Sequence, residues 1–253
     1  GLTEVKLAPG CLIERLELPT STAAVVLEDL PLLTHNNLVV EGDWANVRQI
    51  KISGCPNVTN NFNLIWDWYN KTSNIGVRSV DIQGVNWEGV HIDQLIELGQ
   101  NTNILLKGSI KLTKIDDKTK LLTLKKLYGE NIFNTDSDLH IYGPDSVFVF
   151  GPEDGIILEG DSYQLETIVF SDKAGTLVYN ISEGERVGVN VDRNTGLITT
   201  VENGVESADI TVVSLFVSES NDRFLDEYKI TIQKRVYPKS VSIKGLSRIS
   251  EET

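Results

Sequence analysis

The stretch VDRNTGLITT, Val191 to Thr200, lies between two runs of alternating apolar and polar residues. Val191 is the last residue of an expected strand, residues 192–195 form a turn, and Gly196 supplies the positive φ that a bulged hairpin requires. Leu197 then returns the chain to the core. The stretch therefore predicts a β-hairpin, and its turn serves the architecture rather than a reaction.

Strand-like runs surround this hairpin in the part of the chain that follows Pro144. They show no helical period, and turns such as EGD and DKAG separate them. Short strands at this spacing predict a β-sandwich. The runs are SVFVF, YQLETIVF, LVYNI, GLITT, ADITVVSLFV and EYKITIQ.

The same residues resemble a known family. The series from GIILEGDSYQLETIVF through VNVDRNTGLITT to YKITIQ, within residues 145–235, resembles the group 2 bacterial immunoglobulin-like domain of invasins, intimins and many surface proteins. In that family a strand ending in Val-Asp leads through a Gly turn to a strand starting Leu-Ile or Leu-Val, as it does here between Val191 and Ile198. Tyr179 stands where the family often has Trp, which implies altered core packing in the same fold.

The first half of the chain carries a different token: apolar, any residue, apolar, any residue, Gly. Alternation followed by Gly predicts a short strand with one buried face, which ends where the backbone must bend. The upstream runs EVKLAP and ERLELP are similar, with Pro as the stop. The copies are LVVEG from Leu38, IKISG from Ile50, VDIQG from Val80, ILLKG from Ile104 and LHIYG from Leu139.

Segments with a helical period lie between the later tokens. Their apolar spacing predicts three amphipathic helices. Asn60 or Asn61 is the expected N-cap of the first helix, and Asp116 or Asp117 that of the third. Gly99 and Gly129 are expected to end the second and third helices. The expected buried stripes are Phe62, Ile65, Trp66 and Tyr69; Ile92, Leu95 and Ile96; and Leu121, Leu124, Leu127 and Tyr128.

This alternation of strand and helix resembles an irregular leucine-rich repeat domain of large bacterial surface proteins. Each unit is too small to bury its own apolar faces and must stack on its neighbours. A right-handed β-helix and a compact βαβ sheet remain alternatives. The resemblance implies that the residue between the two buried strand positions points to a concave face. Those residues are Lys6, Glu17, Val39, Lys51, Asp81, Leu105 and His140.

The expected fold class is therefore multidomain, α+β and all-β. A leucine-rich-repeat-like solenoid is expected at residues 1–143, followed by an immunoglobulin-like β-sandwich at residues 144–235. Residues 236–253 are expected to hold a linker and the first strand of a further immunoglobulin-like domain, because YPKSVSIKG repeats the family's opening strand. The chain thus reads as an excerpt of a longer protein.

The charge balance argues against several partners. Thirty-six acidic and 23 basic side chains give a net charge of −13, which repels nucleic-acid phosphates and anionic lipids and favours monomeric behaviour. No segment approaches the roughly 18 apolar residues of a membrane span. The first twenty residues are too charged for a secretion signal, which is either absent or already removed.

No sequence pattern for catalysis is found. The three histidines lie far apart, no serine sits in a nucleophile elbow, and no glycine-rich phosphate loop opens a helix. DRNTG offers oxygens at calcium-loop-like spacing, but a turn that caps its own amides explains them better. Cys11 and Cys55 are expected to be separate buried residues, although pairing stays open. We predict no enzyme activity, no cofactor and no metal.

The four tryptophans, all in the first half, are the remaining candidates for contact with a partner. Trp66 lies on a helical stripe and is expected to be buried. Trp68 and Trp87 lie off the clear apolar faces and are expected to be exposed, where aromatic rings stack on sugars or anchor proteins. The candidate binding residues are Lys51, Asp81, Trp87, Trp68 and His140.

The resulting functional hypothesis is a non-enzymatic extracellular module for binding, adhesion or display at the cell surface. The resemblances together imply a Bacteroidetes origin, with the first domain as recognition surface and the second as spacer. The expected partner is a host or envelope protein or a glycan, with no nucleic acid and no membrane span in this segment. The alternatives are a tail-associated structural protein of a bacteriophage virion and an accessory region of a cell-wall or glycan hydrolase.

Overall fold

The chain forms two compact units in a computed structural model that describes residues 4–7, 15–33, 39–42, 44–72, 79–184, 187–202 and 207–236. The first unit comprises Gly1–Ser146 with Phe170–Asp172, and the second comprises Val147–Val169 with Lys173–Thr253. Residues 236–253 are the segment expected to begin a further domain. All of them except Val236 lie outside the described residues.

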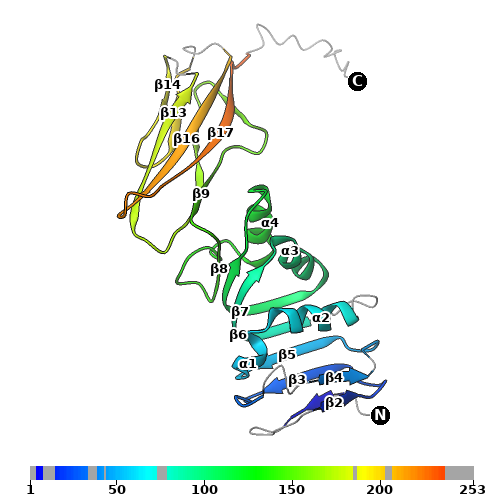
Figure 1. Cartoon of the computed structure of the whole chain (residues 1–253). Helices are drawn as coiled ribbons and strands as arrows, with labels where there is room; N and C mark the ends of the chain where they lie inside the picture. Colours follow the sequence, from blue (N-terminus) through cyan, green and yellow to red (C-terminus); the bar gives the residue numbers. More distant parts are fainter. Residues whose placement is uncertain are drawn as a thin grey trace, which may run out of the picture. The chain divides into compact units, whose positions relative to one another are not determined.

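A six-stranded parallel sheet, in the order β1-β3-β5-β6-β7-β8, organises the first unit. Figure 1 shows β3, β5, β6 and β7 side by side in chain order. A separate parallel pair is formed by β2 and β4. The bounds are β1 Glu4–Lys6, β2 Arg15–Leu18, β3 Ala24–Glu28, β4 Val39–Gly42, β5 Gln49–Ser53, β6 Ser79–Val90, β7 Asn103–Leu112 and β8 Leu139–Tyr142.

The described residues of this unit form the helices α1 Pro56–Thr59, α2 Phe62–Thr72, α3 Ile92–Asn101 and α4 Thr119–Tyr128. The three longer ones confirm the predicted helices. Asn61 caps α2, because its side-chain oxygen accepts a hydrogen bond from the Leu64 amide at 3.1 Å. Gly129 follows α4 with a φ of 115°. The prediction that Gly99 ends α3 is wrong: Gly99 lies inside the helix, where the Tyr128 ring of α4 approaches it closely.

The helices cover one face of the sheet. Val80, Ile82 and Trp87 of β6 point to this face and are buried. The Trp87 ring lies 4.9 Å from the ring of Phe62 in α2, and its indole N–H donates to the Thr59 carbonyl of α1. Burial of these apolar side chains supplies the main stabilisation of the unit.

Two glycines that look like strand ends in the sequence lie inside strands. β6 continues through Gly84 and β7 continues through Gly108. Gln83 pairs with Lys107 and Val85 pairs with Gly108, so Gly84 is the extra residue of a β-bulge, with a φ of 76°. Among the later tokens, only IKISG and LHIYG have their Gly immediately after the strand.

The expected fold class, a leucine-rich-repeat-like solenoid followed by an immunoglobulin-like β-sandwich, is wrong. The structure is mostly β, with 46% strand and 18% helix, and consists of a parallel sheet and several smaller sheets. The physical reason lies in strands of unequal length: β5 has 5 residues and β6 has 12. The bulges in β6 break the fixed period that equal stacked units require.

The second unit is built from β-strands. A four-stranded sheet has the order β10-β17-β16-β13, a three-stranded sheet has the order β11-β15-β14, and β12 pairs with β9. Buried residues of both larger sheets share one apolar core, among them Tyr179, Ile198 and Ile230. The bounds are β9 Ser146–Phe150, β10 Ile156–Leu158, β11 Ser162–Gln164, β12 Glu166–Phe170, β13 Gly175–Glu183, β14 Val189–Val191, β15 Leu197–Thr200, β16 Ala208–Ser218 and β17 Arg223–Gln233.

The predicted hairpin at VDRNTGLITT is confirmed. β14 and β15 pair antiparallel, and Gly196 has a φ of 72°. The Asp192 carboxylate accepts hydrogen bonds from the Asn194 amide at 3.0 Å and from the Thr195 amide at 2.8 Å, so the turn caps its own backbone. Ile198, rather than Leu197, is the residue that is fully buried in the core.

Replacement of Gly108 by Ala tests the close approach of β6 and β7. A Cβ atom at this position would lie 2.1 Å from the Val85 carbonyl oxygen, whereas a Cβ at Gly84 meets nothing within 4 Å. We expect Gly84→Ala to cost about 1–2 kcal/mol through its positive φ, and Gly108→Ala to cost about 1–3 kcal/mol more through the clash. Urea unfolding of the chain, followed by tryptophan fluorescence, measures both. Equal losses would contradict the assigned approach.

The Asp192 turn makes stability depend on pH. Hydrogen bonds from the Thr195 amide and hydroxyl, and then from the Asn194 amide, hold the pKa of Asp192 below its usual value. A depressed folded-state pKa adds stability above the unfolded pKa of about 3.9, and this stability is lost as pH falls through the folded value. Asp192→Asn should therefore flatten the fall in calorimetric melting temperature between about pH 5 and about pH 2. Glu219→Gln removes one exposed carboxylate elsewhere and should keep the parent slope; identical slopes for the two variants would refute the role of the turn.

Candidate recognition surface

The sheet face opposite the helices, called the open face here, carries polar and charged side chains. Strand residues alternate between two faces, so the neighbours of buried Ile50, Ile52 and Ile82 point away from the helices. Residues of the open face are Lys51 and Ser53 of β5; Asp81, Gln83 and Asn86 of β6; Leu105, Lys107, Ser109 and Lys111 of β7; and His140 and Tyr142 of β8.

Lys51, Asp81 and Leu105 form one row across three neighbouring strands. Lys51 is in register with Asp81, and Asp81 is in register with Leu105. The structure thus brings together two of the predicted binding residues, Lys51 and Asp81. Leu105 also belongs to the predicted concave set, and its side chain is 52% exposed. An exposed leucine beside two opposite charges gives this row both apolar and polar contact groups.

Two lysines of the open face form ion pairs with nearby carboxylates. The Lys51 ammonium lies 2.7 Å from the Glu28 carboxylate, and Lys107 lies 3.2 Å from Asp138. The hydrogen bond to Glu28, followed by its negative charge, raises the pKa of Lys51 above the ordinary value. Gln83 donates its side-chain amide to the Asp81 carboxylate at 2.5 Å. These contacts partly compensate the charges of Lys51, Lys107 and Asp81 on the face.

His140 is separate from the Lys51 row. β8 pairs with Gly108–Lys111, the distal half of β7, so His140 is in register with Ser109 rather than with Leu105. The rings of His140 and Tyr142 stack with centroids 5.0 Å apart, and the Lys111 ammonium lies 6.0 Å from the Tyr142 centroid. Burial lowers the pKa of His140 below its ordinary value, because a partly buried site disfavours the charged imidazolium.

Trp68 and Trp87, predicted to be exposed, are buried at 1% and 0% exposure, and that prediction is wrong. The bulge at Gly84 inserts one residue into β6 and reverses the alternation, which turns Trp87 toward the helices. Trp68 packs against Trp44 with ring centroids 5.5 Å apart. Trp66, predicted to be buried, is partly exposed instead, stacked between other rings of α2.

Three residues of the expected concave set lie before Lys51 in the chain: Lys6, Glu17 and Val39. They do not all belong to the sheet that carries the Lys51 row. Lys6 of β1 is in register with Val26 of β3, so β1 does belong to the same sheet. Glu17 and Val39 lie on β2 and β4, which form a sheet of their own. The seven residues expected on one concave face are therefore divided between two sheets.

Tyr142 and Lys111 are residues of the open face that the sequence analysis missed. Tyr142 lies two positions after His140, and a period of two places both residues on one face. Lys111 lies after Gly108, which the sequence pattern predicts as the end of the strand, so the predicted strand stops before Lys111.

The described residues show little chemistry of the catalytic kind. Cys55 is buried, its thiol donates to the Ser53 carbonyl at 3.2 Å, and burial raises its pKa, which disfavours the nucleophilic thiolate. No group of three potential metal-binding side chains occurs among the residues that the structure describes. In the same ranges, no helix is long and apolar enough to span a membrane.

Comparison with known proteins finds no matching family model and no matching curated protein. The two family resemblances and the functional hypothesis that follows from them stay predictions.

The His140 and Tyr142 stack leads to a spectroscopic prediction. Because burial is the cause of the lowered pKa of His140, removal of the covering ring in Tyr142→Ala should raise that pKa toward about 6.5. Lys111→Gln, which leaves the ring in place, should change it much less. NMR titration of the histidine Cε1 protons, assigned with His140→Gln, measures both. An unchanged pKa in Tyr142→Ala would show that Tyr142 does not bury the imidazole.

Proposed function

We propose that the chain is a non-enzymatic binding module of an extracellular protein, used for adhesion or display, and that the open face of the parallel sheet recognises its partner. The row of Lys51, Asp81 and Leu105 carries this proposal. It combines a cation, an anion and an exposed leucine on adjacent strands, where a partner reaches all three at once.

The energetics of this row favour a protein or a glycan as partner over a nucleic acid. Leu105 contributes apolar area that leaves water on binding, and burial of a leucine side chain is worth about 1.5–3 kcal/mol. The charged groups add direction and selectivity rather than net affinity, because Glu28 already compensates Lys51. The net charge of −13 repels nucleic-acid phosphates.

The second unit acts in this proposal as a spacer that carries the first. Two observations support rigidity in such a role: the strands β16 and β17 pair over 10 residues each, and the core is shared by both larger sheets. The cell-surface location and an anchor elsewhere in the full protein belong to the same proposal.

Binding of the full chain to a glycan array and to a host-protein array tests the proposal. Leu105→Ser should weaken any specific interaction by about tenfold, because the apolar anchor is lost. Leu32→Ser is the matched control: Leu32 is 62% exposed in the same unit but lies in the loop after β3, outside the sheet. Tryptophan fluorescence of both variants checks that the first unit is folded.

An interaction that survives Leu105→Ser but is lost in Leu32→Ser would place recognition on the loop. Arrays without a specific binder, or turnover of an arrayed glycan, would contradict the proposed function itself.

A further inference from the structure

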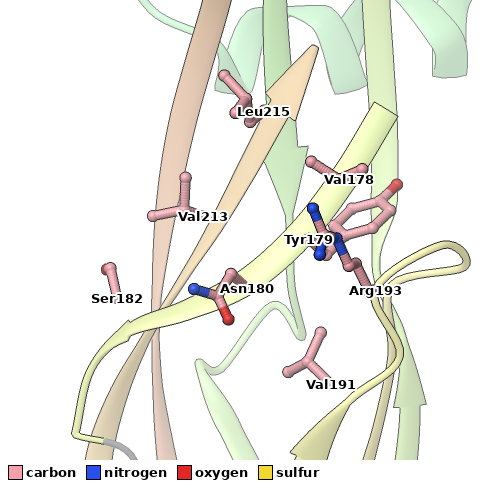
Figure 2. Close-up of a pocket in the computed structure, with 8 residues that line it drawn as sticks. All are labelled: Val178, Tyr179, Asn180, Ser182, Val191, Arg193, Val213 and Leu215. Carbon is pink, nitrogen blue, oxygen red and sulfur yellow. The ribbon is translucent and has the colours of Figure 1, made fainter. Parts of the chain in front are cut away.

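A groove in the second unit lies on the outer surface of the four-stranded sheet. Figure 2 shows that β13 and β16 form its floor, and that β14 and the turn after it bound one side. Its volume is about 440 Å³. The lining residues are Val178, Tyr179, Asn180, Ser182, Val191, Arg193, Val213 and Leu215.

The floor of the groove is aliphatic. Val178 is in register with Leu215, and Asn180 is in register with Val213. The floor residues point outward because their neighbours Tyr179 and Val212 point into the core. Val178, Val213 and Leu215 remain partly exposed, and Leu225 of β17, in register with Leu215, is 64% exposed. Burial of this aliphatic surface by a ligand would therefore be favourable.

The rim of the groove carries a cation, Arg193, whose guanidinium has no partner among the described residues. The Arg193 backbone carbonyl accepts the Tyr179 amide at 2.9 Å, which fixes the turn beside β13. The Arg193 guanidinium itself makes no hydrogen bond or ion pair with any residue in the described ranges, and its side chain is exposed. Such a group has all of its donors available for a carboxylate, which guanidinium binds in bidentate fashion.

The side-chain amide of Asn180 lies between the Arg193 guanidinium and the aliphatic floor of the groove. Within the part of the chain that the structure describes, the Asn180 side chain has no hydrogen-bond partner. A primary amide offers both a donor and an acceptor, which match the carbonyl and the N–H of a peptide group. A fatty acid satisfies the guanidinium and the floor but leaves this amide unused.

We propose that the groove binds an extended peptide segment that carries an aliphatic side chain and a carboxylate side chain. The aliphatic group packs on Val178, Val213 and Leu215, the carboxylate pairs with Arg193, and the peptide backbone bonds to Asn180. This inference concerns a surface other than the open face of the first unit, and it gives the second unit a binding role besides spacing.

NMR titration of the ¹⁵N-labelled full chain tests the proposal with three probes: acetyl-Val-Glu-Leu-amide, its Gln counterpart and decanoate. We expect the Glu peptide to shift the backbone amides of Asn180, Val213 and Leu215. Because charge-assisted bonds to guanidinium are strong, the Gln peptide should bind about tenfold more weakly. Decanoate, which cannot pair with Asn180, should bind more weakly than the Glu peptide.

Two variants and a matched control locate the interaction. Arg193→Gln should reduce the preference for the Glu peptide to about twofold or less. Val213→Ser, at a partly exposed floor position, should weaken both peptides because apolar contact area is lost without a change of charge. Arg223→Gln removes an equal charge from exposed β17 and should leave binding unchanged. Well-dispersed amide spectra show that each variant is folded.

The proposal is overturned if the Glu peptide causes no shifts at about 10 mM, if both peptides bind equally, or if Arg223→Gln acts like Arg193→Gln. Decanoate that binds as tightly as the Glu peptide, with the same dependence on Arg193, would assign the groove to fatty acids. None of these outcomes depends on Leu105, so failure here and failure of the proposed function are distinguishable.

Discussion

The pairing of β6 with β7 is the constraint on which the first unit depends. It is the longest parallel ladder of the sheet and joins Ser79–Val90 to Asn103–Leu112 across two register shifts. The glycine at position 108 lets the β6 backbone approach more closely than any side chain permits. Each register shift reverses the alternation of β6, and the apolar residues that follow it, Val85 and Trp87 and then Val90, are thereby turned toward the helices.

The same shifts explain which parts of the fold follow from the sequence and which do not. Local signals worked where neighbours in the chain decide the outcome: Asn61 caps α2, Gly129 follows α4, and Asp192 closes the hairpin turn. Gly84 was misread because a glycine after an alternating run predicts a strand end and a bulge equally well. The distinction depends on β7, which lies elsewhere in the chain, and the bulge that forms against β7 turns Trp87 to the buried face.

Part of the open face, like part of the fold, could be predicted from the sequence. Lys51, Asp81 and Leu105 are three of the seven residues expected on a concave face, and they lie in one row because the same token recurs in three strands whose registers agree. His140 carries the same token but pairs with the distal half of β7. The register of the edge strand β8 depends on the loop before it. A hydrogen bond from the Gly108 amide to the Asp138 carbonyl anchors that loop, and no local sequence pattern indicates this bond. The groove of the second unit was missed because its residues belong to strands far apart in the chain.

The open face and the groove differ in whether their cations are paired within the protein, and this difference determines which ligands each surface favours. On the open face, Glu28 compensates Lys51, and a partner that binds there gains little from an anion opposite the lysine unless it displaces the glutamate. Affinity must therefore come from Leu105 and from shape. At the groove, Arg193 has no internal competitor in the described ranges, so a carboxylate adds its full contribution. Increased salt should therefore weaken ligand binding at the groove more than ligand binding at the open face. Screening acts on uncompensated exposed charges and leaves the burial of apolar surface intact.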